Sequence, residues 1–452
     1  MTDSEAQSDH RLAVYLDGRR VGVLARPEHG VTTVSFAYDV AVLGDQTAAV
    51  SVRLPVRANP YLEHEALPCF ENLLPDGDLR GLLATGVRRA PTDVVALLGV
   101  FGGECAGALS LWPVGEVPPD PPLYRPCKAA DVRAAFAPSM LASREDIVSP
   151  ARADDASGEV SAGLARVLAN ARASMSGAQE KLVLYRRPQI GADEGEPEYR
   201  LPIAGAPSTV LIKRERFRFP GLLHNELAAM TMMAAAGVPT AEHTVCALDD
   251  TVYETARFDR VCRPDGSVSR LHAEDGCQIT GRLSREKYAE TGGPTYADLT
   301  ASLRRHGTDP GTDIPLLFRW AVANLALGNR DAHAKNVSVV EATGGTRRLA
   351  PAYDVVCTMA YRNLDAVLPL SFAGAQHLAQ LHPGDLKKAA RSFGITPALA
   401  RDLVADVCDR LDASRDDSLD RTAKLAGPHE VLDSIGEVVA HTTAETRRRL
   451  LG

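Results

Sequence analysis

One stretch decides the fold expected for this chain: Gly328-Asn329-Arg330-Asp331-Ala332-His333-Ala334-Lys335-Asn336. It follows the apolar run 314–327, which predicts a helix, and it precedes 337–340, which predicts a strand. Asp331 precedes Asn336 by five positions. In kinase catalytic loops a base aspartate and a metal-binding asparagine have this spacing, because both side chains then leave one loop toward the same phosphates. The spacing therefore predicts a phosphoryl-transfer loop.

Three further residues complete the expected constellation. Asp354 follows a hairpin turned by Gly344-Gly345 and is expected to return beside the loop as the main magnesium ligand. Lys213 ends a predicted strand, where its ammonium group could reach phosphates, and Glu226 on the next helix would steady it. Taken singly, each has an ordinary alternative, such as a solvated lysine or a turn aspartate. Their order along the chain favours the functional interpretation.

The run Ser174-Met175-Ser176-Gly177-Ala178-Gln179-Glu180-Lys181 is a second candidate for phosphate contact. Small residues before a strand allow backbone N–H groups to approach a phosphate, although a flexible turn has the same composition. The run is not a Walker A motif, because the sequence contains no G-x-x-x-x-G-K-[ST] pattern. His333 has no metal-ligating neighbour at zinc-like spacing, which favours a loop-organising or phosphate-contacting role.

Composition limits the class of protein. A chain of 452 residues predicts two to three domains or lobes, and a net charge of -8 argues against bulk coating of nucleic acid. Eight cysteines without a C-x-x-C pair predict buried thiols in a reducing compartment. The first ten residues lack the layout of a signal peptide, and the longest apolar stretch, 227–238, is too short to span a bilayer. We expect a cytoplasmic protein without membrane contact.

The pattern of elements predicts an α+β, bilobal, kinase-like fold. Residues 1–112 favour strands at 12–16, 21–25, 48–56 and 108–112, and helices at 61–74 and 94–98. Six prolines in 113–126 favour an extended connector. The order strand, strand, helix, strand, strand over 181–258 is typical of a small kinase lobe, and the helical patterns beyond it predict an all-helical C-terminal lobe. We expect those helices at 296–305, 314–327, 386–393, 397–411 and 431–450.

Together these motifs resemble the HipA-type toxin kinases. Phe70-Glu71-Asn72-Leu73-Leu74-Pro75-Asp76-Gly77 resembles the N-terminal signature of the family, and 174–181 resembles its phosphate-contacting loop. Ala256-Arg257-Phe258-Asp259-Arg260 resembles its hinge, 331–336 its catalytic loop, and Ala352-Tyr353-Asp354 its metal-binding segment. The resemblance implies four parts: an N-terminal subdomain (1–112), a linker with a mobile loop (113–163), an ATP-binding small lobe (164–258) and a helical catalytic lobe (259–452).

The resemblance also implies an activity and assigns roles. It implies an ATP- and Mg²⁺-dependent serine/threonine protein kinase that autophosphorylates on Ser174, with Asp331 as the proton acceptor and with Asn336 and Asp354 as magnesium ligands. The implied ATP contacts are Ser176, Gly177, Ala178, Gln179, Glu180, Lys181, Lys213, Ala256, Arg257, Phe258, His333, Lys335 and Tyr353. The implied partners are a HipB-like helix-turn-helix antitoxin, through which operator DNA is contacted indirectly, and a protein substrate such as an aminoacyl-tRNA synthetase.

One departure and two alternatives remain at this stage. The hinge of the family often begins with Glu, whereas this chain has Ala256 there. A backbone contact to adenine would survive the change, but a side-chain contact would not. An Asp, Asn, Asp trio also fits a small-molecule phosphotransferase. A catalytically weak co-repressor scaffold that binds an antitoxin is the other alternative.

Overall fold

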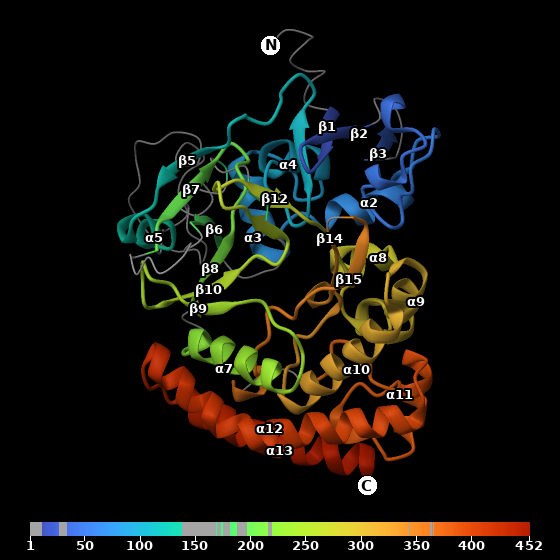
Figure 1. The fold of residues 1–452 in the computed structure, drawn as a ribbon, viewed down its shortest axis with the longest axis vertical. Helices are drawn as coiled ribbons and strands as arrows, with labels where there is room; N and C mark the ends of the chain where they lie inside the picture. Colours follow the sequence, from blue (N-terminus) through green and yellow to red (C-terminus); the bar gives the residue numbers. More distant parts are fainter. Residues whose placement is uncertain are drawn as a thin grey trace. The chain divides into compact units, whose positions relative to one another are not determined.

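The computed structural model describes residues 11–26, 34–137, 169, 173–174, 181–187, 197–215, 219–342, 344–361, 364 and 366–452. The chain forms two compact units. The first consists of Met1–Lys213, Ala247–Asp249 and Asp259–Glu274, and the second of Arg214–Cys246, Asp250–Phe258 and Asp275–Gly452. Figure 1 labels their helices and strands along the colour gradient.

The first unit begins with an antiparallel sheet in the order β3-β2-β1-β4. Its strands are β1 (Arg11–Leu16), β2 (Arg19–Ala25), β3 (Ser35–Tyr38) and β4 (Leu109–Pro113). Asp17 and Gly18 both have positive φ, 44° and 79°, as the predicted two-residue hairpin turn requires. Helices α2 (Glu63–Glu71), α3 (Gly77–Gly86) and α4 (Val94–Phe101) follow β3, and the Asp93 carboxylate caps α4 by accepting from Ala96 N–H at 3.2 Å. Helix α3 was not predicted.

The predicted strand 48–56 is wrong. A 3₁₀ turn at Gln46–Ala48 is followed by bends, and the Gln46 side-chain amide bonds both backbone groups of Val56 at 3.1 Å. The Gln46 amide thus bonds the backbone groups of Val56 that a neighbouring strand would otherwise bond. Pro55 has no N–H and cannot donate to a neighbouring strand. The alternation of apolar and polar residues over 48–56 therefore reflects alternating burial in a loop and not a strand.

The rest of the first unit contains a second group of strands in the order β5-β7-β6-β8. These are β5 (Leu123–Pro126), β6 (Lys181–Arg186), β7 (Tyr199–Ile203) and β8 (Val210–Arg214). The proline-rich connector thus ends in a strand, because β5 pairs antiparallel with β7. Helix α5 (Ala129–Ala135) follows β5, and β11 (Arg260–Cys262) pairs with β12 (Val268–Arg270). Strand β13 (His272–Asp275) ends this segment.

The described part of the second unit is mainly helical, with two antiparallel strand pairs: β9 (His243–Val245) with β10 (Val252–Ala256), and β14 (Ser338–Ala342) with β15 (Thr346–Leu349). The second pair is the hairpin that Gly344-Gly345 predicted. Because β11 to β15 all fall within 259–452, the prediction of an all-helical lobe over those residues is wrong. The helices are α7 (Leu222–Ala235), α8 (Gly276–Thr280), α9 (Tyr296–His306), α10 (Pro310–Ala326), α11 (Asp385–Phe393), α12 (Pro397–Ala426) and α13 (Val431–Leu451).

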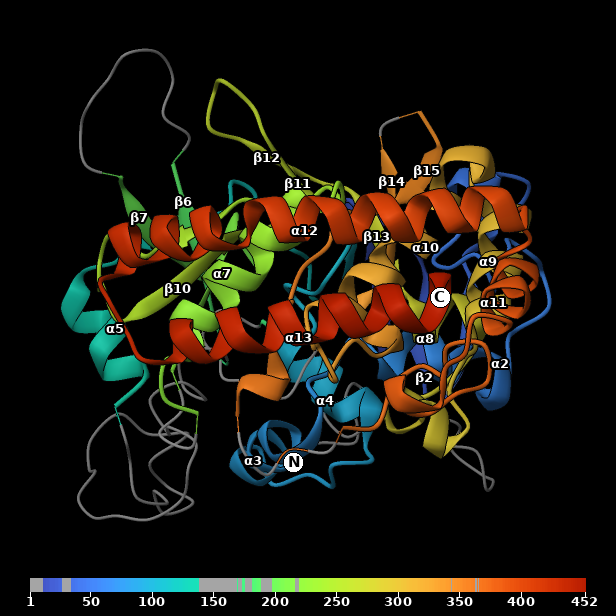
Figure 2. The same cartoon turned by 90° about the horizontal axis from the view of Figure 1, so that it is seen from below.

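The last two helices of the chain pack against each other, and α13 bonds the end of α10. Helix α12 continues fifteen residues past its predicted end at Leu411 and stops before Gly427, with Ser418 and Thr422 extending its buried face. Figure 2 shows α12 and α13 side by side. From α13 the Thr442 hydroxyl donates to the Ala326 carbonyl at the C-terminus of α10, where no helical partner is available. This contact anchors the helix end from which the candidate catalytic loop leaves. None of the helices in the described ranges is long and apolar enough to cross a membrane.

Candidate active site

The loop after α10 is held by asparagine side chains. Gly328, with φ 66°, takes the left-handed conformation that ends the helix. The Asn329 amide donates to Asn324 Oδ1 at 2.8 Å, and Asn329 Oδ1 accepts from the Asp331 N–H at 2.9 Å. Because Asn324 belongs to α10, these two bonds tie the Asp331 backbone to the helix.

Asp331 combines a fixed backbone with an accessible side chain. Its side chain is 50% exposed, whereas that of His333 is 6% exposed. The Tyr288 hydroxyl donates to Asp331 Oδ1 at 2.9 Å, and His333 Nε2 lies 3.9 Å from the same oxygen. An oriented, solvent-accessible carboxylate is the form in which aspartate can accept a proton from an incoming hydroxyl group.

Asn336 faces back onto the same loop. Its Nδ2 donates to the Asp331 carbonyl at 2.8 Å, and the residue is 5% exposed. Committing the NH₂ group to this bond fixes which way the amide points and presents Oδ1 as the acceptor end. The spacing that suggested the loop is therefore realised as a direct contact between residues 331 and 336.

Lys335 lies in a buried ion pair. Its ammonium group is 3.0 Å from Asp275 Oδ2, and the side chains are 2% and 9% exposed. Asp275 also caps α8 by accepting from the Gln278 N–H at 2.9 Å. The loop is thus attached to the start of α8 as well as to the end of α10.

Tyr353 joins the metal-binding segment to the catalytic loop. Its hydroxyl donates to the Lys335 carbonyl at 2.7 Å, and the Ser338 hydroxyl is 2.6 Å away. Its ring stacks on Phe258 with centroids 5.3 Å apart. Asp354 follows with φ 58°, a left-handed conformation that non-glycine residues seldom adopt and that is concentrated at functional sites. Residues 258, 335, 338 and 353 are therefore brought together.

Asn225 and Glu226 connect α7 to this segment. The Asn225 amide bonds both backbone groups of Cys357, accepting from its N–H at 2.7 Å and donating to its carbonyl at 3.0 Å. Burial raises the pKa of Tyr253 well above its usual value, and the negative charges of Glu226 and Asp354 act in the same direction. Both carboxylates therefore lie within electrostatic range of one phenol.

Two lysines predicted to contact phosphate, Lys181 and Lys213, lie on neighbouring strands of the first unit. Lys181 on β6 lies directly opposite Lys213 on β8, and the residues are 7% and 3% exposed. Opposite residues of an antiparallel pair share one face of the sheet, so the two lysines lie side by side on that face. Their contact with phosphate stays a prediction. Lys213 and Glu226 belong to different units, so their pairing stays a prediction.

Five of the predicted ATP contacts cannot be compared with the structure, whereas the hinge residues are described. Ser176, Gly177, Ala178, Gln179 and Glu180 lie outside the described residues, as does the part of the predicted mobile loop from 138 to 163. At the hinge, the Ala256 N–H donates to the Glu242 carbonyl at 2.8 Å, while Arg257 is buried. The amide of Ala256 is thus engaged within the unit.

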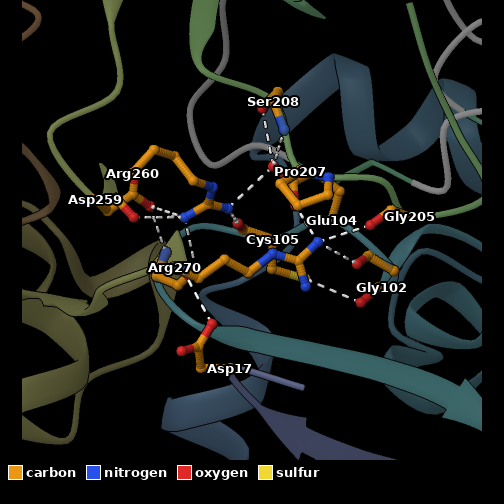
Figure 3. Close-up of polar contacts among 12 residues, drawn as sticks. Asp17, Gly102, Glu104, Cys105, Gly205, Pro207, Ser208, Asp259, Arg260 and Arg270 are labelled. Carbon is orange, nitrogen blue, oxygen red and sulfur yellow. Dashed lines mark hydrogen bonds and ion pairs between the residues drawn. The ribbon is translucent and has the colours of Figure 1, made fainter. Parts of the chain in front are cut away.

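Ser174 is fully buried on the N-terminal part of the first unit. Its hydroxyl donates to the Leu73 carbonyl at 2.7 Å, and its N–H donates to the Glu104 carbonyl at 2.9 Å. The Glu104 carboxylate in turn receives Arg260 Nη2 at 3.0 Å and Arg270 Nη2 at 2.6 Å (Figure 3). Leu73 belongs to the 70–77 signature, so that motif and the candidate phosphate loop meet in space.

Sequence reasoning missed several of these supports. Tyr288, Asn225, Asp275 and Glu104 were not singled out, because each acts through a partner at least 43 residues away. A signal was present for only one of them. Asp275 is followed three residues later by Gln278, the spacing of a capping box, which the structure contains.

Comparison with known proteins assigns this arrangement to a family. A family model described as HipA-like C-terminal domain matches residues 173–415, more than half of the chain. The chain belongs to the HipA family. A second model, HipA N-terminal domain, matches residues 12–112. The resemblance inferred from the motifs is confirmed.

Individual relatives agree with this assignment. The Sinorhizobium fredii protein Y4mE, whose name describes it as a candidate kinase, is 32% identical over 402 residues, covering 88% of this chain and 89% of the relative. The serine/threonine-protein kinase toxin HipA of Shewanella oneidensis is 25% identical over 313 residues, covering 66% and 65%. The structure of Shewanella oneidensis HipA with HipB and operator DNA matches with a TM-score of 0.75 at 20% identity, covering 98% and 97%. This likeness confirms the predicted α+β, HipA-like fold.

Proposed function

We propose that this HipA-family chain is an ATP- and Mg²⁺-dependent serine/threonine protein kinase that acts as the toxin of a toxin–antitoxin pair. The observation that carries the proposal is the environment of Asp331. Its backbone is tied by Asn329 and Asn336, its carboxylate accepts from Tyr288, and its side chain is half exposed. Phosphoryl transfer depends mainly on positioning, and a half-exposed, oriented carboxylate can accept the proton of a serine or threonine hydroxyl.

Asn336 and Asp354 are the proposed magnesium ligands. Mg²⁺ prefers oxygen ligands and is usually held by one or two carboxylates together with substrate phosphates, so a complete protein cage is not required. No cluster of three His, Cys, Asp or Glu side chains suited to a metal occurs in the described ranges, which fits a site completed by phosphate oxygens. The bound ion would neutralise negative charge on the phosphates during transfer.

The proposed ATP contacts come from several elements. Lys181 and Lys213 supply positive charge for the phosphates, with Glu226 as the expected support of Lys213. Ala256, Arg257 and Phe258 are the proposed adenine contacts, and the stacking of Phe258 on Tyr353 supports a ring-binding role there. His333 and Lys335 remain proposed phosphate contacts, and the ion pair of Lys335 with Asp275 would orient its ammonium group.

Ser174 is the proposed autophosphorylation site. In the described conformation its hydroxyl is buried and donates to the Leu73 carbonyl. Phosphorylation of this serine therefore requires its segment to leave both the Leu73 and the Glu104 carbonyls. The division into an N-terminal subdomain (1–112), linker (113–163), small lobe (164–258) and catalytic lobe (259–452) is retained as a proposal.

The proposed partners follow from the family. One solved relative is a complex of HipA, HipB and operator DNA. We extend to this chain a HipB-like antitoxin that contacts operator DNA, and a protein substrate from translation such as an aminoacyl-tRNA synthetase. Action on such a substrate would take place in the cytoplasm.

The test is transfer of label from γ-³²P-ATP with Mg²⁺ to protein. Wild-type chain is incubated alone and with lysate, and the labelled residues are located by mass spectrometry, with Ser174→Ala as the matched variant. Labelled serine or threonine on protein is expected, and self-labelling should fall in the variant. Transfer only to a small solute would favour a small-molecule phosphotransferase. Absence of ATP binding in calorimetry would favour a co-repressor scaffold.

A further inference from the structure

Tyr288 reaches the proposed catalytic aspartate from another part of the chain. It lies 43 positions before Asp331, after the 3₁₀ turn Ser284–Glu286, and its hydroxyl donates to Asp331 Oδ1 at 2.9 Å. No motif used to recognise the catalytic loop includes it. The contact therefore adds a residue to the site that the loop spacing alone does not contain.

The segment that carries Tyr288 is itself held against the catalytic loop. The Lys287 carbonyl accepts from the Ala334 N–H at 3.1 Å, so backbone and side chain of adjacent residues both bond the loop. The Tyr288 ring also meets the His333 ring edge to face, with centroids 5.1 Å apart. The Tyr288 side chain thus contacts the loop at Asp331 and His333, and the preceding residue bonds it at Ala334.

The far side of the segment is closed by a tight turn. The Gly293 N–H donates to the Tyr288 carbonyl at 2.9 Å, and the Ala289 N–H donates to the Pro369 carbonyl at 2.7 Å. A Cβ atom at Gly293 would collide with the carbonyl oxygens of Glu286 and Tyr288. Glycine is therefore required at 293 for the turn whose N–H bonds the Tyr288 carbonyl.

We infer that Tyr288 is a positioning residue that sets the rotation of the Asp331 carboxylate for phosphoryl transfer. This inference rests on the proposed kinase function. A hydrogen bond to Oδ1 restricts rotation of the carboxylate about its terminal torsion, which is otherwise broad. The direction of Oδ2 toward an incoming hydroxyl is then determined as well. A misplacement of about 1 Å can lower a rate by about 10²-fold.

The exposure of Asp331 separates this role from a purely structural one. Water can replace the phenol on a side chain that is 50% exposed, so loss of the hydroxyl should change the free energy of unfolding little. A water molecule moves with the solvent and does not hold the carboxylate in one orientation. The expected signature is therefore a slower chemical step in a normally folded, normally nucleotide-binding protein.

The experiment uses Tyr288→Phe in the full chain, which keeps the ring and removes only the hydroxyl. At saturating ATP and Mg²⁺ the initial rate of protein labelling should fall about 10- to 100-fold, while the ATP concentration for half-maximal rate changes less than about threefold. Tyr296→Phe is the matched control, because Tyr296 is a buried tyrosine of α9 that stacks on Phe393. Its labelling rate should match wild type.

A double variant gives a second readout. In the Asp331→Asn background the residual labelling rate should not fall further when Tyr288→Phe is added, because the orientation of a carboxylate no longer matters. Equal rates for Tyr288→Phe and wild type would overturn the inference while leaving the kinase function intact. So would a rate loss that appears only as weaker ATP binding or a lower melting temperature. Absence of labelling in wild type itself would instead overturn the proposed function.

Discussion

Two carboxylates of this protein, Glu104 and Asp331, have different surroundings. Around Glu104 in the first unit, the carboxylate is fully buried and receives Arg260, Arg270 and Ser208, with the backbone of residues 105, 107 and 205 satisfying more of the arginine N–H groups (Figure 3). Around Asp331 in the second unit, a carboxylate is half exposed and is oriented by a neutral phenol. The first set of contacts is internal to the fold, whereas the second presents a charge to solvent.

The difference separates a carboxylate that stabilises the fold from one that is available for chemistry. A buried ion costs several kcal/mol to desolvate, and the cost is offset only when its partners are complete. The Glu104 carboxylate meets that condition, because two arginines 156 and 166 positions away and Ser208 bond it, so it joins distant segments of the first unit. Asp331 keeps contact with water, which preserves its ability to exchange a proton. Substitutions should therefore affect stability in one region and activity in the other.

The largest expected effect is on activity. Asp331→Asn should lower the rate of protein labelling by about 10²- to 10⁴-fold, the usual contribution of a general base. The free energy of unfolding should change by less than about 0.5 kcal/mol, because the side chain is half exposed and asparagine can still accept from Tyr288. Initial labelling rates and urea denaturation measure the two quantities. A variant that retains full activity would place the catalytic base elsewhere.

The next effect is on stability. Glu104→Ala should lower the free energy of unfolding by about 3–5 kcal/mol, because it leaves Arg260 and Arg270 buried without their shared carboxylate. Urea denaturation followed by circular dichroism measures the change. Glu198→Ala is the control in the same unit, since Glu198 is 44% exposed and its pair with Arg200 should contribute less than about 1 kcal/mol. Similar losses in the two variants would contradict the contrast.

A smaller effect is expected on magnesium dependence. Asn336→Ala should raise the Mg²⁺ concentration needed for half-maximal labelling about 10- to 100-fold, because it removes the amide oxygen and the bond that orients it. The measurement is a Mg²⁺ titration at saturating ATP. Gln380→Ala is the control, because it removes an exposed amide side chain that bonds only the backbone of Gln376 and His377. An unchanged Mg²⁺ requirement in Asn336→Ala would remove this residue from the metal site.

The smallest expected effect concerns Arg330, a buried arginine of the candidate catalytic loop. Arg330 is 8% exposed, and its Nε and Nη1 atoms have no hydrogen-bond partner among the described residues. Burial lowers the pKa of Arg330 to about 10. Because this folded-state pKa lies below the unfolded value, the charged form destabilises the folded protein at neutral pH, and the penalty disappears as pH rises through both values.

Arg330→Met should therefore raise the free energy of unfolding by about 1–2 kcal/mol at pH 7, since an apolar side chain of similar length removes the buried charge. Thermal and urea denaturation at pH 7 provide the measurement. Arg410→Met on the exposed face of α12 is the control, with an expected change within about 0.5 kcal/mol. A clear loss of stability in Arg330→Met would mean that the guanidinium group stabilises the fold after all.

Much of the fold was predictable because its signals are local. The Asp17-Gly18 turn, the Asp93 cap of α4, and the helices α9 to α13 arise from residues a few positions apart. The failures also have physical causes. Residues 48–56 alternate like a strand, but the Gln46 side chain bonds Val56 in place of a neighbouring strand. Strand β7 was missed because it is stabilised by pairing with β5 and β6, which its own five residues do not reveal.

By itself the sequence determined the spacing of Asp331 and Asn336, the helix before them and the hairpin after them, because capping, turn chemistry and periodicity act over a few residues. Only the tertiary structure decided which distant groups meet. It brought Tyr288 to Asp331, placed Lys181 opposite Lys213, and closed Arg260 and Arg270 onto Glu104. The physical reason is that hydrogen bonds and ion pairs depend on distance in space, and a sequence motif records only distance along the chain.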